Sequence, residues 1–356
     1  MRRKGLLLIL VMLLLTSLSC NYVTRQVLGV RESNPSLNSG SGGPAPAKVV
    51  QHLAPGPGEN DISSADLVVN YEIEHTVNLQ NTGQVPVTKI QIWVALVRHV
   101  WPYQIVLSTE TDPAGYQRVS DEYGNEYALF EFKDVAPGDV LDIHLRYAVA
   151  VNAVEITLDE CVGMLPDEFD QPEAFIEADN QRIYNLAGNL STNVANTCQQ
   201  VEAFYNYIGD NITYTGYEPM DLGALTALEN RGGDCTEFSD LFIALNRSQG
   251  IPARFVEGVT YYADGYYEPG QTKHDWTEVY LPGAGWVPVD PTWGKRDNLR
   301  ADYFAAMSPD HIVVTLGRNP SVLQGYHYFY YHYWWDGDTP ATLKADDTWD
   351  IVRVEE

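Results

Sequence analysis

The chain has 356 residues, of which 45% are hydrophobic and 20% are charged, and its formal net charge is −26 at pH 7. This composition is typical of a globular protein, so it excludes a disordered chain and a multispanning membrane protein. The length exceeds what one core usually organises, which predicts two folded domains. Because so many acidic groups repel phosphate backbones, nucleic acid is not an expected partner.

The N-terminus is typical of an export signal. Basic residues 2–4 precede a short apolar run, which predicts a signal peptide over residues 1–19. Cys20 then follows Ser19 as in a bacterial lipoprotein processing site, where the cysteine is lipidated and anchors the chain to the membrane. Ser17 and Ser19 also suit ordinary signal peptidase, which releases the chain, and an uncleaved N-terminal anchor is a third interpretation. All three place the body of the protein outside the cytoplasm.

Two further cysteines, Cys161 and Cys198, are 37 residues apart in the sequence. Thiols outside the cytoplasm tend to oxidise, which favours a disulfide between them. Two buried free thiols are the alternative, because a sequence does not show how far apart the two residues lie in space. No CxxC pair occurs in the chain, so no structural zinc site is predicted. Neither a metal nor another cofactor is expected.

Residues 20–62 are rich in glycine, proline and serine, which predicts a flexible linker. From residue 63 to residue 158, apolar and polar residues alternate in several short runs separated by turn signals, and this predicts an antiparallel β-sandwich. The three histidines of this stretch are scattered, so they are predicted to be satisfied or exposed side chains: His75, His99 and His144. The expected inward-facing rows are Val69, Tyr71, Ile73, Val77 and Leu79; Ile90, Ile92, Val94 and Leu96; and Leu141, Ile143, Leu145, Tyr147 and Val149.

The pattern becomes helical beyond about residue 170 and returns to strands from Phe255. This order predicts an α+β domain over residues 159–356, packed behind the sandwich. Its clearest helix starts near Cys235 and carries one apolar stripe, formed by Phe238, Leu241, Phe242 and Leu245. The segment from Tyr326 to Trp335 is almost entirely aromatic. It is predicted to be a closing strand of this domain, with a stacking platform for glycan or peptide ligands as the alternative.

Cys235 lies at the predicted start of that helix. Gly232 and Gly233 precede it, and Asp234 is a suitable N-cap. The partial positive charge at a helix N-terminus favours a thiolate, whereas the charge of Asp234 opposes one. Taken alone, a cysteine before an apolar helix is typical of a core residue. A chemical role therefore requires a base close to it.

A hairpin supplies that base. Residues 274–280 and 286–290 flank the turn Pro282-Gly283-Ala284-Gly285. A turn centred on Pro282 would pair His274 directly with Asp290, on one face of the sheet and within hydrogen-bond reach. The carboxylate would fix the tautomer of the imidazole, so that the other ring nitrogen could withdraw the proton of the cysteine.

The motifs of this region resemble those of the transglutaminase-like superfamily. They run in order over about 60 residues: Gly233-Asp234-Cys235-Thr236-Glu237-Phe238, Leu241-Phe242, Ala244-Leu245, Gly250-Ile251-Pro252-Ala253-Arg254, His274-Asp275-Trp276-Thr277-Glu278-Val279, and Gly285-Trp286-Val287-Pro288-Val289-Asp290-Pro291-Thr292. The resemblance implies a papain-like α+β fold, with Cys235 as nucleophile, His274 as general base and acid, and Asp290 as the orienting carboxylate. It also implies that the sandwich is similar to the N-terminal domains of bacterial members.

The chain departs from the animal crosslinking members of that family. Asp234 and Thr236 stand where those enzymes have Gln and Trp around the nucleophile, and their calcium sites have no recognisable counterpart. Hydrolysis of an amide therefore has equal standing with transamidation. The amide of Cys235 is the natural first donor of an oxyanion hole, and Tyr214 or Trp276 is the second candidate, with core packing as the alternative for both aromatic residues.

These observations predict an acyl-transfer enzyme that forms a thioester on Cys235. The expected substrates are peptide or glutaminyl amides of extracellular protein or cell-wall peptide. The alternative function is a surface-binding module that keeps the fold without catalysis.

Overall fold

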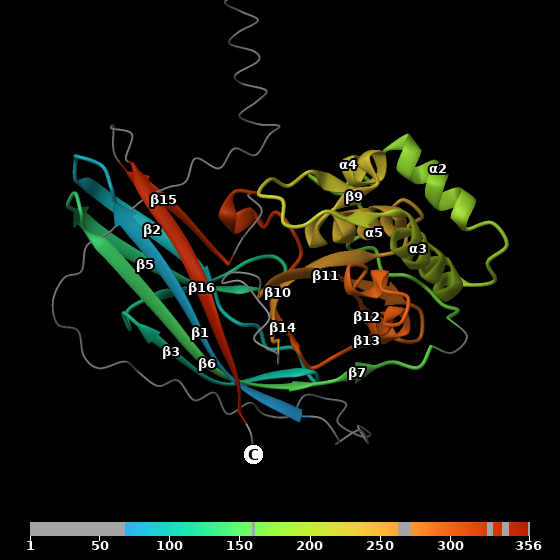
Figure 1. Ribbon diagram of the computed structural model, residues 1–356, viewed down its shortest axis with the longest axis horizontal. Coiled ribbons are helices and arrows are strands. Elements are labelled where there is room, and N and C mark those ends of the chain that lie inside the picture. The colour runs from blue at the N-terminus through green and yellow to red at the C-terminus, as the bar shows by residue number, and fades with distance from the viewer. Residues whose placement is uncertain (1–67, 159–160, 263–271, 326–329, 337–341, 355–356) are drawn as a thin grey trace, which may run out of the picture.

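The computed structural model describes residues 68–158, 161–262, 272–325, 330–336 and 342–354. The predicted signal peptide, Cys20 and the predicted linker lie outside these residues. Within the described ranges, no helix has the length and apolar character needed to cross a membrane. Two halves lie side by side, one built from long strands and the other from helices packed on a smaller sheet (Figure 1).

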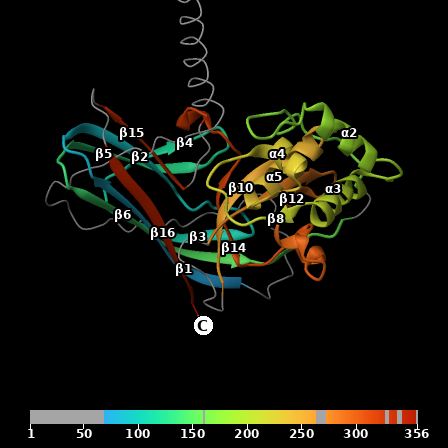
Figure 2. The same cartoon turned by 45° about the horizontal axis from the view of Figure 1, so that its top comes forward.

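The strand-rich half is the predicted antiparallel sandwich. Its two four-stranded sheets share one hydrophobic core and remain separate from the helices when the molecule is turned (Figure 2). The first sheet has the order β16 (Leu343–Val354), β1 (Val68–Asn81), β6 (Val140–Asn152) and β3 (Gln104–Asp112). The second has the order β15 (Tyr331–Asp336), β2 (Val87–Ala95), β5 (Glu126–Val135) and β4 (Gln117–Ser120).

Alternation of side chains explains these strands. Every second residue of β1 from Val69 to Leu79 is buried, and so are the predicted inward rows of β2 and β6. His75 lies within the β1 row, where its Nε2 is 3.1 Å from Asp347 Oδ2 and its ring stacks on Trp349 at 3.9 Å. His75 is therefore a buried core residue whose Nε2 is bonded, while its Nδ1 has no hydrogen-bond partner among the described residues, so the predicted satisfaction of this side chain is met only in part.

The C-terminal strands differ from the predicted domain assignment. β15 pairs with β2 and β16 pairs with β1, so both complete sandwich sheets although residues 159–356 were assigned to the α+β domain. The described part of the aromatic segment is thus a closing strand of the other half, while residues 326–329 lie outside the described residues. Its inward row includes Tyr333, whose register partner is Ile92, while Trp334 packs edge-on against Trp93 with ring centroids 4.4 Å apart. The red strands of Figure 1 show this placement.

The second half is an α+β unit inserted between β6 and β15. Its sheet has the order β12 (Gly285–Val289), β11 (Lys273–Leu281), β10 (Ala253–Thr260) and β14 (His311–Leu316). The α-helices are α2 (Gln181–Leu190), α3 (Thr197–Asn211), α4 (Gly223–Asn230) and α5 (Cys235–Arg247). Smaller elements are β7 (Val154–Glu155), β8 (Thr213–Tyr214), β9 (Gly232–Gly233), β13 (Ala306–Met307), η1 (Trp293–Lys295), η2 (Arg300–Tyr303) and η3 (Ser321–Leu323).

Helix α5 is the centre of this unit. The sequence predicted one buried stripe, but every residue from Thr236 to Arg247 is buried, because α2, α3, α4 and the sheet surround the helix. Each large apolar side chain enclosed in this way contributes about 1.5–3 kcal/mol to folding. The N-terminus of α5 is consequently held in a fixed position against β11.

Cys161 and Cys198 form a disulfide, with their Cα atoms 5.8 Å apart. Cys198 lies in the first turn of α3, and Cys161 lies in the segment that leads from the sandwich toward α2. The bond therefore fastens the entrance of the α+β unit to one of its helices.

Candidate active site

Cys235 is the first residue of α5, and a capping box fixes the backbone there. Asp234 Oδ1 accepts a hydrogen bond of 2.9 Å from the Thr236 amide, and Glu237 Oε2 accepts one of 3.1 Å from the Asp234 amide. An acidic residue followed three positions later by Glu satisfies two amides that a helix N-terminus otherwise leaves unpaired. Cys235, which is half-buried, is therefore presented at the positive end of the helix.

The histidine strand meets the helix at this point. Thr236 Oγ1 donates a buried hydrogen bond of 2.7 Å to Asp275 Oδ2, and the backbone N–H of Asp275 donates to the sulfur of Cys235. Since Asp275 directly follows His274, these two bonds join the nucleophile's helix to the strand that carries the base.

The electrostatics of the sulfur differ from the expectation for a helix N-terminus. Burial raises the pKa of the Cys235 thiol well above its ordinary value, and the carboxylates of Asp275 and Asp234 add to this effect. The amide of Asp275 acts in the opposite direction but does not outweigh them. The resting site therefore favours the protonated thiol, and chemistry requires a base that removes the proton during attack.

His274 and Asp290 form the predicted imidazole–carboxylate pair. His274 Nε2 lies 2.8 Å from Asp290 Oδ2, and the amides of Thr292 and Trp293 donate to the other carboxylate oxygen at 2.8 Å and 3.0 Å. Burial alone would raise the pKa of Asp290, but the charge and hydrogen bond of His274, assisted by His311, hold it below its ordinary value. Asp290 is thus ionised and accepts from Nε2, which leaves Nδ1 as the basic nitrogen.

The hairpin register differs from the prediction. Leu281 pairs with Gly285 and Thr277 pairs with Val289, so the turn centres on Gly283 rather than on Pro282. Gly283 and Gly285 adopt left-handed φ values of 87° and 81°, which glycine tolerates best. This recentring moves the pairing by two residues. A shift of two keeps the same face of the sheet, so His274 and Asp290 still meet, but diagonally and not as direct partners.

A second histidine, which sequence reasoning missed, bonds to the same carboxylate. His311 Nε2 lies 3.3 Å from Asp290 Oδ2, and the imidazoles of His274 and His311 have ring centroids 5.6 Å apart. The donor atoms of the two histidines and Asp290 all lie within 4.8 Å of one another, and their hydrogen bonds account for this proximity. No local motif marks His311, because only the pairing of β14 with β10 brings it to the site.

The two aromatic residues predicted for the oxyanion hole have different surroundings. Trp276 is 2% exposed and packs with Val256 and Leu316, as a core residue does. Tyr214 is 48% exposed. Partial burial and the charges of Cys235 and Asp234 raise the pKa of Tyr214 to about 12. Tyr214 therefore remains a protonated phenol close to the sulfur, able to donate a hydrogen bond.

The loop over residues 215–222 is bonded to the start of α5, which the sequence did not reveal. Its backbone is fastened to the start of α5, because the Glu218 amide donates to Asp234 Oδ2 at 2.8 Å and the Leu222 amide donates to Glu237 Oε1 at 3.0 Å. Two large side chains of this loop, Tyr217 and Met220, are exposed. The loop therefore carries exposed apolar side chains on a segment that is bonded to the capping residues of α5.

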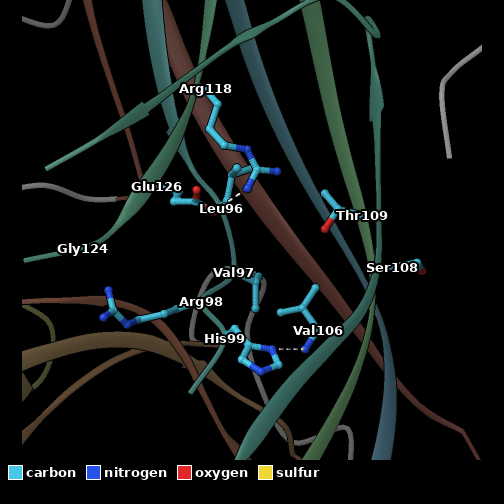
Figure 3. Close-up of a pocket in the computed structure, with 10 residues that line it drawn as sticks. All are labelled: Leu96, Val97, Arg98, His99, Val106, Ser108, Thr109, Arg118, Gly124 and Glu126. Atoms are coloured by element: carbon cyan, nitrogen blue, oxygen red, sulfur yellow. Dashed lines mark hydrogen bonds and ion pairs between the residues drawn. The ribbon is translucent and has the colours of Figure 1, made fainter. Parts of the chain in front are cut away.

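A cavity of about 150 Å³ lies in the sandwich, away from these residues (Figure 3). Its charged lining is already paired in part, since Arg118 bonds to Glu126 at 2.5 Å. The cavity is lined by Leu96, Val97, Arg98, His99, Val106, Ser108, Thr109, Arg118, Gly124 and Glu126. Neither Cys235, His274 nor Asp290 is among them.

Comparisons with known proteins agree with this geometry. Residues 184–291 match the family described as the transglutaminase-like superfamily. The uncharacterized protein YebA of Bacillus subtilis (strain 168) is 32% identical over 173 residues, which is 43% of this chain and 22% of YebA. A protein-glutamine gamma-glutamyltransferase of Pseudomonas aeruginosa is 33% identical over 73 residues, or 18% of this chain and 10% of that protein. The chain therefore spans only a minor part of these relatives.

A solved structure is similar over a larger share of the chain. The crystal structure of a candidate cysteine protease from Cytophaga hutchinsonii has a TM-score of 0.58 and 17% sequence identity, covering 82% of this chain and 92% of that one. At this identity the similarity concerns the fold, including the strand-rich half. The family match contains Cys235, His274 and Asp290, and the chain thus carries, over residues 184–291, a domain of the transglutaminase-like superfamily.

Proposed function

We propose that this protein is a cysteine acyl-transfer enzyme that acts on amides of peptides outside the cytoplasm. The observation that supports it best is the 2.8 Å bond from His274 to Asp290. His274 lies on β11, and the next residue of that strand, Asp275, bonds both to Thr236 and to the sulfur of Cys235. A buried His–Asp pair that is fastened to a cysteine at a helix N-terminus contains the groups that acyl transfer requires.

The proposed reaction has two halves. His274 Nδ1 takes the thiol proton while the sulfur of Cys235 attacks the amide carbonyl, and the amide of Cys235 and the Tyr214 hydroxyl donate to the oxygen that becomes negative. The C–N bond then breaks, the proton passes from Nδ1 to the leaving nitrogen, and a thioester remains. In the second half, water or a primary amine attacks the thioester, its proton goes to His274, and the thiol is restored.

The acceptor decides between hydrolysis and transamidation. Asp234 and Glu237 are committed to capping α5, and Asp275 is bonded to Thr236. The carboxylates of Asp234 and Asp275 give the surroundings of the sulfur a negative charge, which attracts a protonated amine to the site. That amine must lose one proton to the solvent before the neutral amine can attack the thioester, so transamidation and hydrolysis both stay open. Extracellular protein or cell-wall peptide is the substrate class that fits an exported enzyme with exposed apolar side chains in the loop over residues 215–222.

The location is part of the same proposal. An export signal over residues 1–19 and lipidation of Cys20 would anchor the chain at the outer face of the membrane, and the segment up to residue 62 would serve as spacer. Incorporation of labelled fatty acid into the full chain, lost in Cys20→Ala, is the expected result. If the processed chain carries no lipid, the protein is secreted and is not anchored to the membrane.

The enzymatic part is tested by trapping the intermediate. The purified chain is mixed with a glutaminyl peptide and quenched in acid, and mass spectrometry should find the acyl group on Cys235. Addition of a labelled primary amine then separates transamidation, which incorporates the label, from hydrolysis, which releases the acid. Cys235→Ala is the control and should give neither. A wild-type chain that forms no adduct and releases no product would leave a binding module as the better account.

A further inference from the structure

We propose that His311 is a positioning residue that holds Asp290 in place for the imidazole of His274. This inference depends on the proposed function, since it concerns the base of the same reaction. It assigns a role to a residue that lies outside the matched family region, which ends at residue 291. The relevant residues are His311 on β14, Asp290 after β12 and His274 on β11.

The hydrogen bonds around Asp290 define the tautomer of His311. The carboxylate accepts four bonds, with the Thr292 and Trp293 amides on Oδ1 and the two imidazoles on Oδ2. An ionised carboxylate only accepts, so Nε2 of His311 must carry a hydrogen. Its Nδ1 lies 3.3 Å from Ser308 Oγ. In the neutral ring, Nδ1 accepts from the Ser308 hydroxyl, and the chain of donors runs from Ser308 through His311 to Asp290.

The surroundings of His311 favour this neutral ring. Burial lowers the pKa of His311, the nearby His274 lowers it further, and Asp290 only partly compensates. The titratable groups that face His311 are Asp290, His274 on β11, Tyr303 on η2 and its own neighbour Asp310. Those that face the reacting pair are Cys235, Asp234, Asp275 and Tyr214. His311 is thus a neutral donor, and not a second cation beside His274.

A β-bulge directs His311 toward the site. Glu257 pairs with Thr315, but Gly258 pairs with Val313, so β14 contains one additional residue at this point. Beyond the bulge Thr260 pairs with His311, while Gly258 pairs with His274 on the other neighbouring strand. Gly258 and Thr260 share a face, so both histidines lie on it. Without the additional residue, the pairing would place His311 on the opposite face.

Close packing holds the bulge and the imidazole. A Cβ on Gly258 would come within 2.3 Å of the Trp276 ring and 2.4 Å of the Ile312 carbonyl oxygen, so glycine is required for this approach. Trp293 and Trp276 contact His311 edge-on, with ring centroids 4.7 Å and 5.2 Å away. The ring therefore has little freedom to turn away from Asp290.

The second donor has two consequences for the reaction. The hydrogen bond from His311 fixes the direction in which Asp290 Oδ2 points. It also stabilises the negative charge of the carboxylate, which would otherwise interact with His274 as its single imidazole partner. Removal of the donor should leave a less ordered and more basic carboxylate. An imidazolium at His274 would then release its proton less readily, which slows transfer to the leaving nitrogen.

The experiment compares three substitutions in the full chain. His311→Leu removes the donor; His311→Gln places an amide N–H near the position of Nε2; His311→Asn places one near Nδ1 instead. Alkylation of Cys235 by iodoacetamide is measured from pH 4 to pH 10, and kcat and KM are measured on a glutaminyl peptide. We expect His311→Leu and His311→Asn to shift the basic limb, which is the high-pH side of the plot of alkylation rate against pH, upward by about one pH unit. Both variants should also lower kcat about tenfold and keep KM within about twofold of the wild type. His311→Gln should restore both.

The matched control is His75→Gln, which alters another buried histidine that bonds to an aspartate, 3.1 Å from Asp347. It should lower stability and leave the profile unchanged. The inference is overturned if folded His311→Leu or His311→Asn keeps the wild-type limb and kcat, if His311→Gln behaves like His311→Asn, or if His75→Gln shifts the limb equally. Failure of the proposed function itself would look different, because the wild-type chain would then show no turnover and no acyl group on Cys235.

Discussion

Thr236 and Asp275 connect the two segments of the candidate site through a buried hydrogen bond of 2.7 Å. Each stands next to a residue of the proposed reaction, Thr236 after Cys235 and Asp275 after His274. The animal crosslinking enzymes have Trp where this chain has Thr236. In this chain the Thr236 hydroxyl supplies a hydrogen bond that the buried carboxylate of Asp275 requires. The bond therefore sets how far the start of α5 lies from β11.

Thr236→Val should loosen this junction. A hydrogen bond to a charged group contributes about 1.5–3 kcal/mol, and its loss leaves Asp275 with one donor fewer. We expect the free energy of urea unfolding to fall by about that amount and kcat to fall with it. Thr236→Ser keeps the hydroxyl and is the matched control. Equal losses in both variants would indicate that packing of the methyl group, and not the hydrogen bond, is what matters.

Asp290→Asn should abolish most of the activity without unfolding the chain. The new side chain keeps an oxygen for the Thr292 and Trp293 amides but turns an NH2 group toward Nε2 of His274. His274 would then hold its proton on Nδ1, the nitrogen that must receive the thiol proton. A wrong tautomer of this kind lowers kcat by about 10²–10⁴-fold. Steady-state kinetics and circular dichroism together check this, and a loss below about fivefold would contradict it.

Tyr214→Phe tests the oxyanion hole. The phenol remains protonated, because its pKa is raised to about 12, so the hydroxyl is available as a donor at any working pH. Removal of one such donor lowers kcat by about 10²-fold. Tyr217→Phe, in the neighbouring loop, is the comparison and should change kcat by less than about twofold. Should both substitutions have equally small effects, the second donor must be sought elsewhere.

Glu237 makes stability depend on pH. Burial and the charge of Asp234 raise the pKa of Glu237 to about 7, so the folded state binds a proton more tightly than the unfolded state does. The stabilisation is therefore present below the ordinary pKa of Glu and is lost as pH rises through about 7, with a size of about 3 kcal/mol. Glu237→Gln mimics the protonated form. Urea unfolding between pH 5 and pH 8 should show a larger loss for the wild type than for this variant, and parallel losses would refute the assignment.

Reduction should weaken the α+β unit. The Cys161–Cys198 disulfide closes a loop of 37 residues, and a loop of this length contributes about 4 kcal/mol through the entropy of the unfolded chain. A reductant should lower the melting temperature of the wild type. The double variant Cys161→Ser with Cys198→Ser should melt at the reduced value whether or not reductant is present. A wild type that is insensitive to reductant would show that the bond carries little of the stability.

Local patterns were sufficient to predict much of the fold and the pair at its centre. The alternating row of β1, the capping sequence from Asp234 to Glu237 and the hairpin that brings His274 near Asp290 each depend on residues close together in the chain. The register of that hairpin was wrong by two residues, because Gly283 and Gly285 take up the turn. A period of two made the error harmless for the contact.

Long-range pairing could not be predicted in the same way. The sequences of β15 and β16 predict strands but do not indicate which sheet the strands join. The pairing of β15 with β2 and of β16 with β1 therefore could not be predicted from them. His311 is hidden for a related reason. Its direction depends on one additional residue in β14, and a bulge leaves no periodic signal that distinguishes it from a regular strand.

The pairing of β15 and β16 also bears on how the protein is made. These strands follow the α+β unit in chain order, so β1 and β2 must wait with open edges until the whole inserted unit has been synthesised. Open edges readily pair with other chains. The inserted unit is in turn fastened to the sandwich by the chain both where it begins and where it returns (Figure 1). A single cut by a protease inside it would therefore release neither piece.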